Sequence, residues 1–410
     1  MAEQHVGFMH TTSNRDAEGR WVFDTTTHFR LSDRANSTIT KELLFDANYP
    51  WPLLVARLGN QSGTSSSNVV AIAEDGGFAV TIEGDKKRET QLRGSFTLQD
   101  FVRLETWLQH EAPAPGTTTT APALDLDKLA ITHQRYRVAD LNATGYLIEQ
   151  DAPLAANQIQ LDANFRPSHL QVSGTFSFEA ANESAAINLD TLESKTDYLL
   201  PVDQRLTEHT KLTALNLSVE SDVSLDLPAT LNLRAGAVTQ NLSRTNPDQY
   251  TGEELQFPIT DARIQTMVQK LLHADSDILV DRLVKHVHHT LLYAENRPAG
   301  SVTNALDSGR GECTDFADLF TTLARAANLP ARNVYGLVYR DSSQPGFVFH
   351  AWNEVYTAGG WRAVDPTWDQ TIIDATHLPL DERTAGLVML GSSRKAVSLS
   401  VLSTQYQSES

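Results

Sequence analysis

The amino-acid sequence predicts an α+β protein, in which a mostly-β N-terminal half precedes a C-terminal domain of helices packed on an antiparallel sheet. Two observations lead to this prediction. Up to about residue 250, β-propensive stretches alternate with turn signals. From Pro258 onward, apolar residues recur at the i, i+3, i+4 spacing of amphipathic helices. A run of strands followed by a run of helices is typical of α+β folds or of separate domains.

Length and charge narrow the class of protein. A chain of 410 residues is expected to hold two or three domains, and its 40% apolar and 20% charged residues are ordinary globular values. The net charge of −18 argues against unspecific binding to nucleic acid or to anionic membranes. We expect no membrane insertion, because no stretch approaches the roughly 18 apolar residues of a membrane span.

The N-terminal half is predicted to contain two β-rich modules, residues 1–110 and residues 125–250. Asp75-Gly76-Gly77 is a hairpin signal in the first module, and Leu98 to Leu108 is predicted to form one short helix. Residues 111–124 hold three prolines and four consecutive threonines, which is typical of a linker or an extended surface loop.

A five-residue pattern occurs in both modules. Phe45-Asp46-Ala47-Asn48-Tyr49 is echoed 116 positions later by Leu161-Asp162-Ala163-Asn164-Phe165. Duplication of a β-module would explain the echo, and so would chance similarity of a short segment. A binding or spacer role suits such modules, but they offer no candidate site residue.

Residues 251–380 are predicted to form the chemically active domain. Two amphipathic helices open it, one capped by Thr260 and one that begins at Asp275-Ser276-Asp277. Their apolar positions are Ile264, Met267, Val268, Leu271 and Leu272, and then Val280, Leu283, Val284, Val287 and Leu291. Residues 381–410 are predicted to be a C-terminal extension, with strands at Leu387–Leu390 and Val397–Leu402 and a frayed polar tail from Ser403.

Three histidines on the second helix raise the question of a metal site. Only His286 and His289 share a face, His288 does not, and no thiol or carboxylate completes a ligand set. We therefore expect solvated or packing histidines here, and no metal.

The only cysteine lies at the predicted start of a helix. After Cys313, apolar residues keep the helical spacing until Asn328-Leu329-Pro330 ends the pattern. Unpaired N–H groups and the helix dipole at an N-terminus favour a thiolate, and the same N–H groups can hold an oxyanion. We expect Cys313 to be a partly exposed nucleophile, although a single cysteine is also commonly a small buried apolar residue.

His350 and Asp365 fall on two strands of a predicted hairpin, residues 347–356 and 361–366. A loop of two or four residues pairs Tyr356 with Trp361 and Trp352 with Asp365. His350 and Asp365 then lie diagonally on one face, roughly 7–8 Å apart at the backbone. A three-residue loop would turn Asp365 to the opposite face. We expect the carboxylate of Asp365 to accept the Nδ1 proton of His350 and to fix its tautomer.

These motifs resemble those of the transglutaminase-like superfamily, whose members have a papain-like core. The matching residues are Gly-Glu-Cys-Thr-Asp-Phe-Ala around Cys313, the run from Leu323 to Arg332, His350-Ala351-Trp352 and Asp365-Pro366-Thr367. The resemblance covers about residues 260–380, and Asp374-Ala375-Thr376-His377-Leu378 is similar to the segment after the triad in bacterial members. It implies a bacterial type of protein with a Cys-His-Asp triad and a β-rich N-terminal half.

The superfamily includes proteases, amidases, transglutaminases and inactive members, so the resemblance leaves the reaction open. We expect acyl transfer through a thioester on protein or peptide amides, with hydrolysis favoured because water needs no second pocket. Protein cross-linking by a transglutaminase is the first alternative, and a binding protein with a vestigial triad is the second. No cofactor is expected.

Some features of the site stay open in the sequence. Trp352 and Trp361 are expected to line the substrate site, with packing in the hairpin core as the alternative. The second oxyanion donor stays unassigned, with Tyr293, Asn296 and Gln256 as upstream candidates. The first five residues show neither the basic region nor the apolar region of a leader. The resemblance is compatible with export after removal of a leader, and a cytoplasmic location is the alternative.

Overall fold

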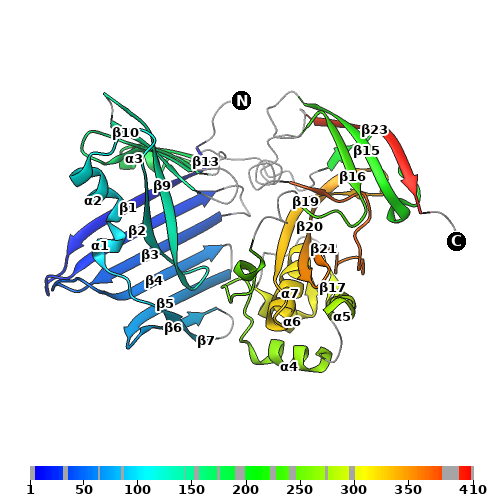
Figure 1. Ribbon diagram of the computed structural model, residues 1–410, viewed down its shortest axis with the longest axis horizontal. Coiled ribbons are helices and arrows are strands. Elements are labelled where there is room, and N and C mark those ends of the chain that lie inside the picture. The colour runs from blue at the N-terminus through cyan, green and yellow to red at the C-terminus, as the bar shows by residue number, and fades with distance from the viewer. Residues whose placement is uncertain are drawn as a thin grey trace. The chain divides into compact units, whose positions relative to one another are not determined.

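The computed structural model describes residues 5–407 apart from 31–35, 63–64, 85–86, 144, 152–156, 173–175, 190–198, 222–227, 240–245, 273–275, 295–300 and 381–396. The chain forms two compact units, residues 1–194 and residues 195–410. Two β-sheets build most of the first unit, and the second unit combines helices with sheets (Figure 1). This is the predicted α+β architecture.

The first sheet of the N-terminal unit is a seven-stranded antiparallel meander in the order β1 to β7. Its strands are β1 (Gly7–Arg15), β2 (Trp21–Arg30), β3 (Asn36–Phe45), β4 (Leu53–Ser62), β5 (Ser65–Glu74), β6 (Gly77–Glu83) and β7 (Arg88–Arg93). The predicted hairpin at Asp75-Gly76 is confirmed, since β5 and β6 pair up to Glu74 and Gly77. Gly76 has a φ of 84°, which a residue with a side chain rarely adopts.

The second sheet is a six-stranded meander that begins at residue 118. Its strands are β8 (Thr118–Asp125), β9 (Ala130–Asn142), β10 (Gly145–Gln150), β11 (Asn157–Leu161), β12 (Pro167–Val172) and β13 (Phe176–Glu179). Two helices, α1 (Leu98–Phe101) and α2 (Arg103–Glu111), precede it, and α3 (Glu183–Ala186) follows it. The helix predicted between Leu98 and Leu108 is therefore two helices that meet at Val102, whose ψ of 20° ends the first one.

The segment predicted as a linker is instead largely a strand. β8 pairs with β9 from Thr118 to Asp125. Threonine favours strands, and Pro122 is tolerated because β8 is an edge strand, where one N–H group needs no ladder partner. The domain borders differ from the predicted ones accordingly. The two predicted modules share one unit up to residue 194, and residues 195–250 belong to the second unit.

The echoed five-residue pattern marks two similar turns. Asp46 accepts a hydrogen bond from the N–H of Asn48 at 2.7 Å between β3 and β4, and Asp162 accepts one from the N–H of Asn164 at 2.8 Å between β11 and β12. An aspartate that caps its own turn in this way is common between strands. The shared turn chemistry accounts for the echo without requiring duplication of a module.

In its described part, the second unit holds four α-helices and the sheet that carries His350 and leads to Asp365. The helices are α4 (Ala262–Leu271), α5 (Ser276–Thr290), α6 (Val302–Ser308) and α7 (Cys313–Ala326). The sheet has the order β14-β20-β19-β22, with β21 also paired to β20. Its strands are β14 (Leu199–Pro201), β19 (Ala331–Arg340), β20 (Gly346–Thr357), β21 (Gly360–Val364) and β22 (Leu378–Pro379). Asp261, and not the predicted Thr260, caps α4 by accepting the N–H of Arg263.

The predicted helical stripes form the core between these helices and the sheet. Nearly all their members are buried around α7 in one cluster, together with residues of β20 and β21. Figure 1 shows α5, α6 and α7 beside β19, β20 and β21. The buried face of α7 packs against β20, the strand that carries His350. This packing keeps the N-terminus of α7 close to His350.

Two smaller sheets complete the described part of the unit. β15 (Leu212–Ser221) lies between β16 (Thr230–Arg234) and β23 (Val397–Tyr406) in a three-stranded sheet. The predicted strand at Val397–Leu402 is confirmed, but the predicted frayed tail is wrong up to Tyr406, because its backbone pairs with β15. The predicted strand at Leu387–Leu390 lies outside the described residues. β17 (Leu292–Tyr293) and β18 (Arg310–Gly311) pair in parallel just before α7.

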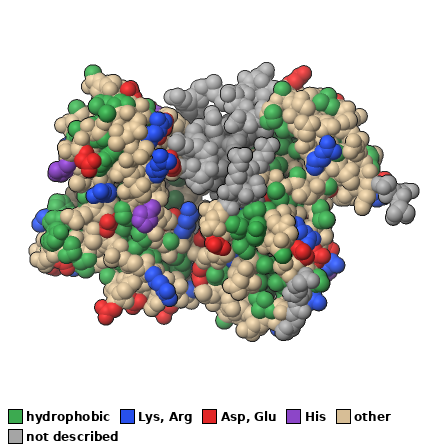
Figure 2. All heavy atoms as spheres, in the orientation of Figure 1, with side chains coloured by type: hydrophobic (Ala, Val, Ile, Leu, Met, Phe, Trp, Pro, Cys, Tyr) green, Lys and Arg blue, Asp and Glu red, His purple; other side chains and the backbone are tan. Residues whose placement is uncertain are grey.

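The visible surface carries both signs of charge. Figure 2 shows acidic and basic side chains interspersed over the face in view, without a continuous patch of one sign. Among the described residues, no helix is both long enough and apolar enough to cross a membrane.

Candidate active site

Local backbone chemistry places Cys313 at the first turn of α7. Glu312 is the N-cap, and the carboxylate of Asp315 accepts its N–H at 2.8 Å to close a capping box. A side chain at Gly311 would put its Cβ 2.6 Å from the Cβ of Asp315, so the close approach needs glycine. The helix start is confirmed, but Cys313 is only 8% exposed, which is less than the partial exposure expected for it.

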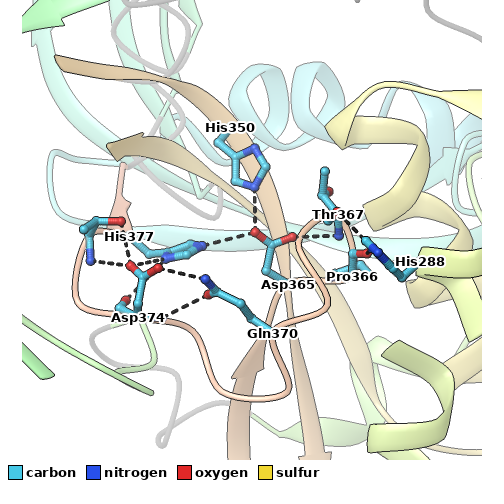
Figure 3. Close-up of polar contacts among 9 residues, drawn as sticks. His288, His350, Asp365, Pro366, Thr367, Gln370, Asp374 and His377 are labelled. Atoms are coloured by element: carbon cyan, nitrogen blue, oxygen red, sulfur yellow. Dashed lines mark hydrogen bonds and ion pairs between the residues drawn. The ribbon is translucent and has the colours of Figure 1, made fainter. Parts of the chain in front are cut away.

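The hairpin register is the predicted one. β20 and β21 pair Tyr356 with Trp361 and Thr357 with Gly360, which leaves a loop of two residues. Asp365 follows the last strand residue and reaches the face of His350. The Nε2 atom of His350 lies 2.8 Å from Oδ2 of Asp365 (Figure 3).

The predicted tautomer is wrong. Asp365 contacts Nε2 of the imidazole and not Nδ1, which was expected to face it. The thiol of Cys313 also interacts with His350, so Nδ1 is the nitrogen left for it. The proton that Asp365 fixes is therefore the one on Nε2, and Nδ1 is free to exchange a proton with sulfur.

Asp365 and His350 form a buried ion pair. Burial lowers the pKa of His350, but Asp365 and Cys313 outweigh this and raise it to about 10. Burial raises the pKa of Asp365, but its bonds to His350 and His377 hold it well below its usual range. The second carboxylate oxygen, Oδ1, accepts the N–H of Thr367 at 2.8 Å. Both oxygens thus face donors, which keeps the carboxylate ionised.

A second histidine, His377, joins the site, although no motif of the sequence assigns it a role. The Nε2 atom of His377 lies 3.3 Å from the same oxygen of Asp365, and its Nδ1 faces Asp374 (Figure 3). The segment Asp374-Ala375-Thr376-His377 belongs to the family resemblance, which assigns no function to its histidine. Among the described residues, His350, Asp365 and His377 form the group whose ligand atoms lie close enough, within 4.8 Å, to suit a metal ion. Hydrogen bonds and ion pairs already account for these contacts.

For Trp352 the structure agrees with the stated alternative, packing in the hairpin core. Trp352 is 1% exposed and packs with Val334, Ala363 and Ile373, so it lies in the hairpin core and supports His350 from within. Trp361 packs against Tyr250 and Tyr356 at the loop end of the hairpin.

Trp368 takes the position at the rim of the site. Its ring stacks on His350 with centroids 4.6 Å apart, and the residue is 36% exposed. The sequence offered little to single out Trp368, because the turn after Asp365 follows no strand or helix periodicity.

Asn353 ties α7 to β20. Its buried side-chain amide donates to the carbonyl of Ala317 and to Oγ1 of Thr321, both at 2.9 Å. Because Asn353 lies three residues after His350 on β20, this anchor fixes the distance between the sulfur and the imidazole.

Asp318, which follows Cys313 on the same helix α7, carries a buried carboxyl group. Burial raises the pKa of Asp318 to about 7, although the amides of Asn333 and Gln256 donate to it. Gln256 also lies 3.3 Å from the hydroxyl of Tyr335, whose ring packs against Cys313.

Two of the three candidate oxyanion donors can be placed. Gln256 is linked to the thiol through Tyr335, whereas Tyr293 pairs with Gly311 and its ring lies 6.4 Å from that of Phe316. Asn296 lies outside the described residues. Both described candidates flank the start of α7, so the choice between them stays open.

The three histidines of α5 do not converge on one point. The ring of His288 bonds the carbonyl oxygen of Thr367 at 3.1 Å, and that of His289 bonds the carbonyl oxygen of Lys285 at 2.6 Å. His288 thereby holds the turn after Asp365 from outside (Figure 3).

Comparison with known proteins agrees with the site. Residues 268–366 match the family model of the transglutaminase-like superfamily, and this stretch includes Cys313, His350 and Asp365 but ends before His377. The C-terminal unit therefore contains a transglutaminase-like domain.

Individual relatives cover only part of the chain. Kyphoscoliosis peptidase is 32% identical in Mus musculus over 98 residues and 31% identical in Homo sapiens over 96 residues. Each match covers 22% of this chain, and 15% or 14% of the relative, so the chain spans about a seventh of their length. A solved structure of a candidate cysteine protease from Cytophaga hutchinsonii has a TM-score of 0.30 and 16% identity, over 43% of this chain and 66% of that one.

Replacement of Asp365 by Asn tests the site geometry. The amide keeps one acceptor oxygen but turns its NH2 group toward either Thr367 or the two histidines, all of which donate. We expect carboxamidomethylation of Cys313 by iodoacetamide at neutral pH to slow by at least about tenfold, because the imidazolium loses its counter-ion. Asp281→Asn, which removes the exposed partner of Arg362, is the matched control and should leave the rate unchanged. An unaltered rate in Asp365→Asn would refute the role of the carboxylate.

Asp318 predicts a pH effect on stability. Its pKa is raised from 3.8 to about 7 in the folded state, so the folded protein keeps a proton that the unfolded chain loses. The stability from this proton is complete below about pH 4 and is lost as the pH rises through about 7. Asp318→Asn cannot ionise, so we expect its melting temperature relative to wild type to rise between about pH 5 and about pH 8. Asp277→Asn, at an exposed position of α5, should show no such trend, and parallel melting curves for wild type and Asp318→Asn would contradict the assignment.

Proposed function

We propose that the C-terminal unit is a thiol-dependent hydrolase of protein or peptide amides. The observation that carries this proposal is the buried ion pair of His350 and Asp365. The ring of His350 also interacts with the thiol of Cys313, which lies at the start of α7. A structural thiol needs neither an ion-paired histidine nor a helix N-terminus. The curated relatives that match this domain are named as peptidases, which agrees with hydrolysis.

The residues divide the chemistry as follows. His350 takes the thiol proton on Nδ1, and the sulfur of Cys313 attacks the amide carbonyl carbon. The oxyanion lies at the first turn of α7, where N–H groups have no partner within the helix. His350 then gives its proton to the leaving amine as the C–N bond breaks, which leaves a thioester on Cys313. Water, deprotonated by the same nitrogen, hydrolyses the thioester and releases the acid.

Asp365 holds the ring in place throughout. Because its bond is to Nε2, the ring can exchange protons at Nδ1 without turning. Trp368 covers one side of the imidazole and limits access of water to the ion pair. An apolar rim for a peptide side chain is offered by the exposed Leu292 and Tyr293 of β17. This strand pairs with β18, which lies directly before α7.

Transamidation uses the same thioester and differs only in the acceptor. An amine acceptor would need a second approach to the thioester, and hydrolysis needs none, so we place hydrolysis first.

Casein offered together with a fluorescent primary amine separates the reactions. We expect new α-amino groups or ammonia, without amine incorporation, from wild type and not from Cys313→Ala. Incorporation of the amine by wild type would replace hydrolysis with transamidation. Equal behaviour of wild type and Cys313→Ala, together with slow alkylation of Cys313, would favour a binding protein with a vestigial triad.

A further inference from the structure

His377 is surrounded by hydrogen-bond acceptors on both ring nitrogens. Its Nε2 lies 3.3 Å from Oδ2 of Asp365. Its Nδ1 lies 3.3 Å from the carbonyl oxygen of Asp374 and 3.4 Å from Oδ1 of the same residue. A carbonyl oxygen and an ionised carboxylate can only accept, and a neutral imidazole carries one N–H. A neutral ring would therefore point a lone pair at an oxygen inside a fully buried site.

Neither aspartate can supply the missing proton. Oδ1 of Asp374 accepts the N–H of Thr376 at 2.8 Å and its hydroxyl at 2.6 Å, and Oδ2 accepts the amide of Gln370 at 2.8 Å. Asp365 is equally enclosed by donors. Burial raises the pKa of Asp374, but these bonds and His377 lower it below its usual value. Both carboxylates are thus ionised, and the proton belongs to the histidine.

We infer that His377 is a permanent imidazolium that holds Asp365 in place for His350, and thus acts as a fourth, positioning member of the site. The geometry requires two N–H groups on this ring, and Asp374 anchors its far side. Its charge also balances that of Asp365, since the site otherwise places two carboxylates near a single imidazole. Burial lowers the pKa of His377, but Asp365 and Asp374 outweigh this and raise it.

Among the described residues, the charged and titratable groups that act on the two rings all belong to the site. They are Asp365, Asp374 and Cys313, together with the rings themselves, whose centroids lie 6.0 Å apart. The role of His377 in reactivity rests on the proposed function, but its protonation does not. A metal bound by His350, Asp365 and His377 would have to replace the proton on both Nε2 atoms, so the two explanations exclude each other.

The protonation of His377 can be tested by NMR of the histidine ring nitrogens in the full-length protein. After labelling with 15N-histidine, we expect two rings in wild type, those of His350 and His377, with both nitrogens protonated from about pH 6 to about pH 9, a range in which an ordinary histidine loses its proton. His350 meets the same condition, so His377→Gln assigns the signal. If that variant does not fold, two such rings in wild type are expected and at most one would overturn the inference. A zinc ion retained after dialysis and lost in His377→Gln would also overturn it.

The positioning role has a separate test that a merely structural residue would not pass. Gln at 377 keeps a donor for Asp365, and Phe keeps none. We expect His377→Phe to slow alkylation of Cys313 at least about tenfold, as loss of an orienting partner does at other sites, and His377→Gln to restore much of the rate. The control His169→Gln removes an exposed histidine of the N-terminal unit and should change nothing. Equal rates in the Gln and Phe variants, or no effect of either, would contradict the role. If wild-type Cys313 is unreactive, the proposed function fails while the resonance test still decides the protonation.

Discussion

The carboxylate of Asp365 is the constraint on which the site depends. It is completely buried, and a buried charge costs several kcal/mol unless donors surround it. The structure supplies those donors from three places: His350 on β20, the N–H of Thr367 in the turn, and His377 before β22. Hairpin, turn and the following loop are thus held together by one anion.

The same arrangement explains how a thiol and an imidazole come to face each other. The helix start is set by Glu312 and Asp315, and the apolar face of α7 packs on the sheet. Asn353 then fixes α7 against the strand of His350. The reactive atoms belong to two rigid elements, so their geometry does not depend on a mobile loop. Asp365, Thr367 and His377 lie in irregular backbone, where dense hydrogen bonding replaces regular structure.

Local patterns in the sequence were sufficient for the parts of the site that lie on regular elements. Helical spacing located the start of α7, and strand alternation with a short loop located Asp365 opposite His350. The nitrogen that faces Asp365 was predicted wrongly, because alternation fixes the face of a side chain but not the rotation of its ring. His377 and Trp368 were missed since both come from the turns after β21, where no periodicity relates residues to one another. Residues 118–125 and 403–406 were misread because their strand partners, β9 and β15, are decided by tertiary pairing and not by composition.

In the proposed mechanism, Cys313 forms a thioester with the help of His350. This step can be tested with p-nitrophenyl acetate, acid quench and mass analysis of the intact protein and its peptides. We expect one acetyl group on Cys313 that hydroxylamine removes, little acetylation in His350→Ala and none at this site in Cys313→Ala. Acetylation that is as fast in His350→Ala as in wild type, or that occurs elsewhere in the chain and not on Cys313, would contradict it.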